Sequence, residues 1–193
     1  MMKKRYFAIP ILAIALHFLL SNLLYFLVER LVLDVFHIPP QQFMKHSYWG
    51  EILIYAVLIL VFFTLYKLLW RKEISEPRTA TNFKDVLGSL VVGFGICGIS
   101  GLWIMLAEQL PSLQKSVEAM NAGAENIAGG NAFGTFMIAV IAAPVVEEIL
   151  FRGIVLRSMR KFTPAWAAIL ISSVLFGAYH LNIVQTAYAT LMG

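Results

Sequence analysis

The sequence predicts an all-α protein, a polytopic bundle of transmembrane helices with about five complete spans and the start of a sixth. Of its 193 residues, 60% are hydrophobic and only 13% are charged, and the mean hydropathy is +0.77. Water-soluble domains are less apolar and carry about twice as many charges. A chain of this length has room for several helices of about 20 apolar residues each, but not for two large domains. We therefore expect one membrane-embedded domain over residues 1–193.

Apolar runs separated by charged connectors give the expected spans. The first run follows a basic N-terminus, but it is too long for a secretory signal and no small-residue cleavage site follows it, so it reads as a retained anchor. The third is rich in glycine and serine, which lets helices in lipid approach closely. In chain order the runs are Tyr6–Val28, Ile52–Trp70, Phe83–Leu106, Ala132 to about Leu156, and Pro164 to about Asn182, with a sixth beginning near Val184.

Basic residues are concentrated in alternate connectors, which predicts an orientation. They gather at the N-terminus, between Lys67 and Lys84, and between Arg157 and Lys161. Cytoplasmic connectors carry an excess of Lys and Arg, so we expect an integral membrane protein with a cytoplasmic N-terminus. This clustering explains the net charge of +4 by contact with membrane lipids, and we expect no nucleic-acid partner. The connector Ala107–Asn131 is either an interfacial helix or a loop that covers the bundle.

Four ionisable residues interrupt the last two apolar runs. Glu147, Glu148 and Arg152 lie in the fourth run, and His180 lies near the end of the fifth. Ionisable groups at membrane depth are costly and mark function by default. Glu148 precedes Arg152 by four residues, the favourable order for an ion pair within a helix. Glu147 is rotated by about 100° from Glu148, and Phe151 stands four positions after it, so Glu147 is the candidate for chemistry.

The depths of Glu147 and His180 allow them to share a site. Glu147 comes 13 residues before Arg160, and His180 comes 16 residues after Pro164, or about 20 and 24 Å from a common cytoplasmic turn. If the two runs form a hairpin, both side chains lie at a similar level. Gly177 is expected to leave space beside the histidine. A water held between the two groups could then be activated for attack, as hydrolysis requires.

Two motifs together carry a family resemblance. Glu147-Glu148-x-x-x-Arg152, followed by Phe176-x-x-x-His180, resembles the CAAX protease and bacteriocin-processing (CPBP, or Abi) family of intramembrane proteases over the last third of the chain. The resemblance implies a multi-span helical peptidase that cleaves a peptide or protein substrate within or near the bilayer, here in a bacterial cell membrane. Some members process prenylated CAAX proteins, and others act in bacteriocin production and immunity. It also assigns the attacking water to Glu147 and His180, with Glu148 and Arg152 in support.

One departure from the family pattern bears on activity. Members carry a further histidine and, four residues later, an asparagine that are thought to polarise the scissile carbonyl. No such pair follows His180, so the motif-bearing region of about 132–193 is expected to be incomplete at its C-terminus. Losing one oxyanion donor costs about a hundredfold to a thousandfold in rate, and we expect weak or absent activity from the chain as given.

A divalent metal such as zinc is the main alternative for the chemistry. Glu147, Glu148 and His180 would be its ligands. However, the chain has no His-Glu-x-x-His sequence, and ligation by Glu148 would compete with its pairing to Arg152. We favour a mechanism without a metal or other cofactor, in which Glu147 is the general base and His180 holds the water.

Two alternatives belong to other functional classes. A catalytically impaired or non-catalytic scaffold or bacteriocin-immunity protein would bind a hydrophobic peptide in the bundle. A proton-coupled transporter could use buried glutamates as a relay, but such proteins commonly have paired repeats with broken helices, and no internal repeat is evident. The lone Cys97 excludes a disulfide framework and a cysteine metal cluster.

Overall fold

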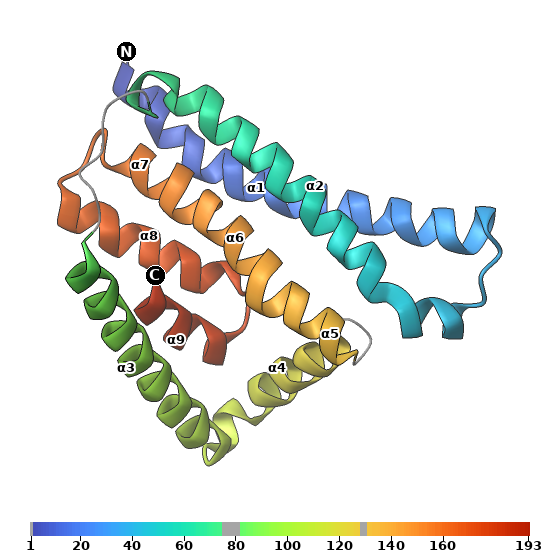
Figure 1. The fold of residues 1–193 in the computed structure, drawn as a ribbon. Coiled ribbons are helices and arrows are strands. Elements are labelled where there is room, and N and C mark those ends of the chain that lie inside the picture. Colours follow the sequence, from blue (N-terminus) through green and yellow to red (C-terminus); the bar gives the residue numbers. More distant parts are fainter. Residues whose placement is uncertain (1, 75–81, 128–130) are drawn as a thin grey trace. The chain divides into compact units, whose positions relative to one another are not determined.

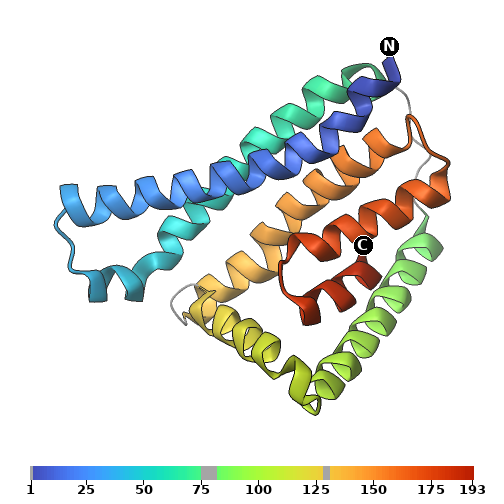
Figure 2. The same cartoon turned by 180° about the vertical axis from the view of Figure 1, so that it is seen from behind.

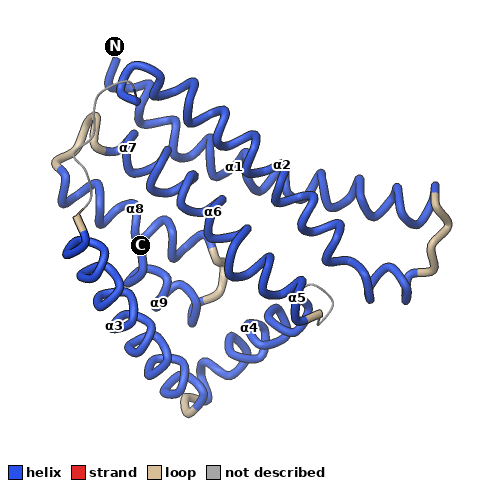
Figure 3. The backbone as a smooth tube through the Cα atoms, in the orientation of Figure 1, coloured by secondary structure: helices blue, strands red, loops and turns tan. Residues whose placement is uncertain are grey.

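The structure is a computed structural model that describes residues 2–74, 82–127 and 131–193. Within these ranges the regular structure is entirely helical and contains no strand, as Figure 3 shows. The predicted all-α class is therefore confirmed. The described helices are α1 (Met2–Arg30), η1 (Leu31–Val35), α2 (Pro40–Ile74), α3 (Phe83–Glu108), η2 (Pro111–Leu113), α4 (Gln114–Asn126), α5 (Ala132–Thr135), η4 (Phe136–Ala142), α6 (Ala143–Glu147), η5 (Glu148–Val155), α7 (Leu156–Met159), α8 (Ala165–Tyr179) and α9 (Ile183–Met192).

Three helical segments are long and apolar enough to cross a membrane. They are Tyr6–Val35, Ser47–Lys72 and Phe83–Glu108, which contain the first three expected spans. The following connector contains the helix α4, and its predicted place at the membrane interface stays a prediction. At 15 residues α8 is about 22 Å long, shorter than the fifth run suggested and shorter than a hydrocarbon core of about 30 Å.

The fourth apolar run is helical from Ala132 to Met159, but its winding changes along its length. The segments η4 and η5 are π-helical, and α6 lies between them. Pro144, in the first turn of α6, has no N–H to donate, and its ring excludes the carbonyl one turn earlier. The N–H of Ala143 reaches back five residues, to the carbonyl of Ile138. The proline thus accounts for the wider turn before it.

The chain divides into two compact units. The first comprises Met1–Leu69 and Gly123–Pro164, and the second comprises Trp70–Ala122 and Ala165–Gly193. Each is described by itself below, and the expectation of one membrane-embedded domain stays a prediction.

In the first unit, α2 runs parallel to the helical run α5–α7 (Figures 1 and 2). Near the start of α2, the ring of Trp49 lies 6.4 Å from that of Phe133 in α5. Further along, Tyr66 contacts Gly153, where an added Cβ would lie 3.1 Å from the tyrosine ring. The guanidinium of Arg157 lies 5.1 Å from the same ring. The contacts follow the same order along both helices, as expected for the second and fourth of a series of alternating spans.

α1 runs antiparallel to the same helical run. The hydroxyl of Ser158, in α7, donates a 2.6 Å hydrogen bond to the carbonyl of Tyr6. The rings of Phe7 and Phe162 meet at 5.9 Å. The N-terminal end of α1, the C-terminal half of α2 and α7 therefore gather at one end of the unit. Lys67 and Arg157, from two of the basic segments of the sequence, lie at this end, and the cytoplasmic orientation of the N-terminus stays a prediction.

In the second unit, α8 and α9 form a close hairpin to which α3 and α4 are attached. Trp103 of α3 donates its indole N–H to the carbonyl of Val184 at 3.0 Å. Val184 is fully buried in a small apolar cluster with Ala107 and with Val117 of α4. Most of α3 beyond these contacts is exposed, which suits a helix whose surface faces lipid.

Candidate active site

The acidic motif lies where the winding of the fourth helical run changes. Glu147 is the last residue of α6, and Glu148 is the first residue of the π-helical η5. Such π-helical turns occur frequently at functional sites, because the wider turn re-aims the side chains on it. The hydrophobic pattern could not reveal this change, because Pro144 accounts only for the wider turn that precedes it.

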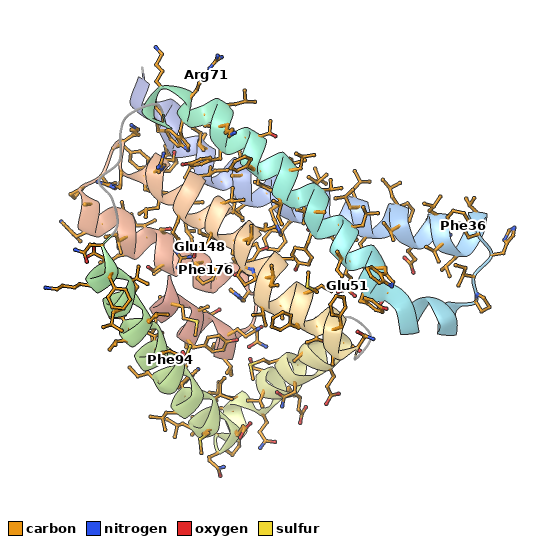
Figure 4. All side chains as sticks on the ribbon, viewed as in Figure 1. Phe36, Glu51, Arg71, Phe94, Glu148 and Phe176 are labelled. Atoms are coloured by element: carbon orange, nitrogen blue, oxygen red, sulfur yellow. The ribbon has the colours of Figure 1, made fainter. Side chains whose placement is uncertain are left out.

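Glu148 and Arg152 form the ion pair that the sequence predicts. Oε1 of Glu148 lies 3.5 Å from Nη1 of Arg152, and the two side chains are 61% and 30% exposed. Figure 4 labels Glu148 on this helix. The pair lines a pocket of about 290 Å³ between α2 and η5, in the first unit. One carboxylate of the motif is thus held by a cation of its own helix.

Glu147 is half-buried on the same helical run, and its carboxyl group lies close to α2. Its charge interacts with the hydroxyl of Tyr55, as does the charge of Glu51, one turn earlier in α2. Sequence reasoning missed Tyr55 and Glu51. The only signal for them was an acid and a phenol four residues apart at the start of an apolar run, with nothing to connect them to a helix 90 residues later.

His180 belongs to the second unit and stands in the turn directly after α8. Its Nδ1 lies 2.9 Å from the carbonyl oxygen of Phe176. Its ring also meets the rings of Phe176 and Tyr179 edge-on, at 5.1 and 5.7 Å. Because a carbonyl oxygen only accepts, Nδ1 must carry the proton, and in the neutral ring Nε2 presents a lone pair. The bond to the helix end therefore orients the imidazole and leaves it an acceptor for water.

The turn that carries His180 is fixed from both sides. Leu181 adopts a left-handed backbone conformation with φ of 54°, which is uncommon for a residue with a branched side chain. Asn182 caps α9 by accepting from the N–H groups of Val184 and Gln185 at 3.0 and 3.1 Å. The amide of Asn182 donates to the carbonyl of Ser116 in α4 at 2.8 Å. The asparagine is a cap, and it ties the histidine turn to a helix far away in the sequence.

The expectation that Gly177 leaves space beside His180 is wrong. A Cβ built on Gly177 would lie 2.6 Å from the carbonyl oxygen of Thr186 and would overlap the hydroxyl of Thr190. The hydroxyl of Thr186 donates to the carbonyl of Gly177 at 3.1 Å. The missing side chain therefore admits the backbone of α9, and not a substrate or a water.

The four predicted site residues lie in different units. Glu147, Glu148 and Arg152 belong to the first, and His180 belongs to the second. The meeting of Glu147 with His180 therefore stays a prediction. Within the described residues of either unit, no three His, Cys, Asp or Glu side chains form a group that could hold a metal ion. The donor set also fits zinc poorly, because Glu148 is engaged by Arg152.

The long apolar helices define an integral membrane protein. Its motifs are a Glu-Glu-x-x-x-Arg segment and a downstream histidine. Residues 129–193, about a third of the chain, match the family described as Type II CAAX prenyl endopeptidase Rce1-like. The match confirms the predicted resemblance and supports an intramembrane protease as the kind of protein. No curated protein and no solved structure gave a significant match.

Proposed function

We propose that this protein is an intramembrane endopeptidase that hydrolyses a peptide bond of a membrane-associated peptide or protein with a water activated by Glu147 and His180. The observation that carries the proposal is the fixed orientation of His180 within the region similar to the endopeptidase family. Its Nε2 acceptor is what a water-binding histidine needs, and the paired motifs supply the carboxylate.

The proposed reaction consumes one water. The Glu147 carboxylate takes a proton from a water that also donates a hydrogen bond to Nε2 of His180. The water oxygen attacks the scissile carbonyl carbon and forms a tetrahedral intermediate. The C–N bond then breaks, and the proton held by Glu147 passes to the leaving nitrogen, so that an acid and an amine are released.

Arg152 and Glu148 act as positioning residues in this proposal. Their 3.5 Å pair lies on the same helical run as the proposed base, with Arg152 five residues after Glu147. The same pairing engages the second carboxylate that zinc would require, and it therefore supports a reaction without a metal.

A cleavage assay on the Glu147→Gln variant tests the proposed role of Glu147 as the general base. The glutamine is nearly isosteric but cannot take a proton, so we expect the rate to fall by about a hundredfold to ten-thousandfold. The substrate is a prenylated peptide with a C-terminal CAAX sequence, incubated with the full-length protein in lipid. The matched control is Glu118→Gln, an exposed acid on α4, which should leave the rate unchanged.

Removal of divalent metal from the wild-type protein with a chelator distinguishes the metal-free mechanism from a zinc-dependent one. We expect the rate to survive removal of divalent metal. Activity that disappears on chelation and returns only with zinc would overturn the metal-free mechanism. Biological function retained in Glu147→Gln, with no turnover detected in the wild type, would instead favour a non-catalytic scaffold.

A further inference from the structure

The pocket beside the Glu148–Arg152 pair contains a second arginine. Its volume is about 290 Å³, and Arg157 lines it together with Phe63, Tyr66 and Gly153. A water occupies about 30 Å³ of liquid, so the pocket has room for a group the size of a phosphate and the glycerol attached to it. All of these residues belong to the first unit.

The charges around this pocket are mostly positive. Arg152 and Arg157 line it, and the ammonium of Lys67 lies 4.7 Å from the ring centre of Phe63, one of the lining residues. Glu148 is the one carboxylate among the lining residues. The lining residues carry two cations and one anion, and because Glu148 pairs with Arg152, Arg157 leaves the lining with a net positive charge that favours an anionic ligand.

Arg157 is held in a way that suits an oxyanion. Its guanidinium lies over the ring of Tyr66, 5.1 Å from the ring centre. The ring attracts the positive charge of the guanidinium, which carries five N–H donors. The planar fork matches the spacing of phosphate oxygens and can donate two parallel hydrogen bonds. The tyrosine thus pre-orders the long side chain, which lowers the entropy lost on binding.

The pocket also lies at the basic end of the first unit. Ser158, the residue after Arg157, bonds to Tyr6, close to the basic N-terminus. Basic residues next to a span are attracted to anionic lipid headgroups at the cytoplasmic surface, and aromatic rings such as Phe63 and Tyr66 are typical of the headgroup region. The apolar surface of α2 would lie beside the acyl chains.

We propose that this pocket binds the phosphate of an anionic membrane lipid, with Arg157 as its principal hydrogen-bond donor and Lys67 as a second cation. The site goes beyond the proposed protease, because none of its ligands is a catalytic group. It would place a lipid headgroup one turn from the Glu148–Arg152 pair.

Binding of a phosphatidylglycerol with a fluorescent acyl chain to the full-length protein in neutral detergent tests the site. Unlabelled phosphatidylglycerol should displace the probe, and phosphatidylcholine should not. Each basic residue near an anionic lipid surface contributes about a fivefold gain in affinity, so Arg157→Gln and Lys67→Gln should each weaken binding about fivefold, and together about 25-fold. Arg157→Lys should retain more affinity than Arg157→Gln, because it keeps the charge.

Arg30→Gln is the matched control. Arg30 also stacks on a ring in a membrane helix, 5.3 Å from the ring centre of Phe26, but it lies at the other end of α1. Equal weakening in Arg30→Gln, or wild-type binding in the double variant of Arg157 and Lys67, would overturn the site. Inorganic phosphate or glycerol phosphate that displaces the probe as well as the lipid does would overturn the lipid as ligand and assign a free phosphate. Displacement by phosphatidylcholine as effective as that by phosphatidylglycerol would show that the pocket does not select a net negative headgroup, and it would overturn an anionic lipid as the ligand.

Discussion

One hydrogen bond of His180 determines the tautomer and the direction of its imidazole ring. Its Nδ1 is engaged by the carbonyl of Phe176, so the ring is fixed as one tautomer and in one direction. The sequence placed this histidine near the end of an apolar run and offered it as a water ligand. The structure adds a contact with a backbone carbonyl, which uses Nδ1 and leaves Nε2 for the proposed water.

The energy of the Glu148–Arg152 pair can be measured with a double-mutant cycle. Both side chains are partly exposed, and the pair spans four residues of one helix, so we expect a coupling free energy of only about 0.2–0.5 kcal/mol. The measurement is unfolding of Glu148→Gln, Arg152→Gln and the double variant in mild detergent.

Cleavage by the same variants separates positioning from stability. If the pair positions Glu147, the single variants should lose activity far out of proportion to this small change in stability. Activity that falls only in step with the folded fraction would contradict the positioning role.

The ion pair was predictable because both partners lie in one helical turn, where spacing fixes the geometry. Tyr55 was not predictable in the same way, since its interaction with Glu147 depends on how α2 packs beside α6. Ser116 and Asn182 are a similar case, because they are 66 residues apart and meet through tertiary packing alone. Interactions within one helical turn can be predicted from sequence spacing, but contacts between helices can be predicted only once the fold is known.

The α8–α9 hairpin depends on glycine at position 177. Gly177→Ala would push a methyl group against the carbonyl of Thr186, a backbone atom that cannot move away alone. Overpacking of this kind costs about 1–3 kcal/mol, so we expect a lower free energy of unfolding, measured by denaturation in detergent.

Gly98→Ala in α3 is the matched control for the hairpin. No other group lies within 4 Å of a Cβ built there, and alanine is the better helix former by about 1 kcal/mol. This variant should be neutral or more stable. Equal destabilisation by both substitutions would show that loss of a glycine in any helix, and not the contact with α9, is responsible.

The hydrophobic runs predicted where the helices lie, but they did not predict which helical turns are π-helical. The first three spans appear where the apolar runs place them, because burial of backbone groups in lipid leaves few alternatives to a helix. The π-helical segments on either side of α6 were not predictable from hydropathy, since the backbone carbonyls rearrange around Pro144 without a change in apolar pattern. The glycine at 177 was misread because its neighbour, α9, lies later in the chain.

The two units must bring Glu147 and His180 together if the proposed protease is correct. Replacing Cys97 by serine removes the one cysteine of the chain, so Glu147→Cys and His180→Cys can then be introduced as a pair. We expect a short bifunctional thiol reagent to cross-link this pair within one chain, which is detected as a shift in gel mobility.

The control for cross-linking is Glu147→Cys paired with Asp85→Cys. Asp85 is in the first turn of α3, at the end predicted to be cytoplasmic, so its depth should differ from that of Glu147 by about 20 Å. Absence of the Glu147–His180 cross-link, with both thiols reactive, would exclude a shared site. Efficient cross-linking of the control pair would contradict the predicted depths.

In the proposed reaction, the contact with the carbonyl of Phe176 would also limit which nitrogen of His180 can exchange a proton. A histidine with both nitrogens accessible can accept a proton on one edge and release it from the other, as a relay. Here the Nδ1 edge is closed by its own helix, so any exchange must occur at Nε2. If the proposed reaction is correct, the water must bind at this Nε2 edge. A substrate peptide would then have to approach the imidazole at Nε2 and not at the edge that contacts α8.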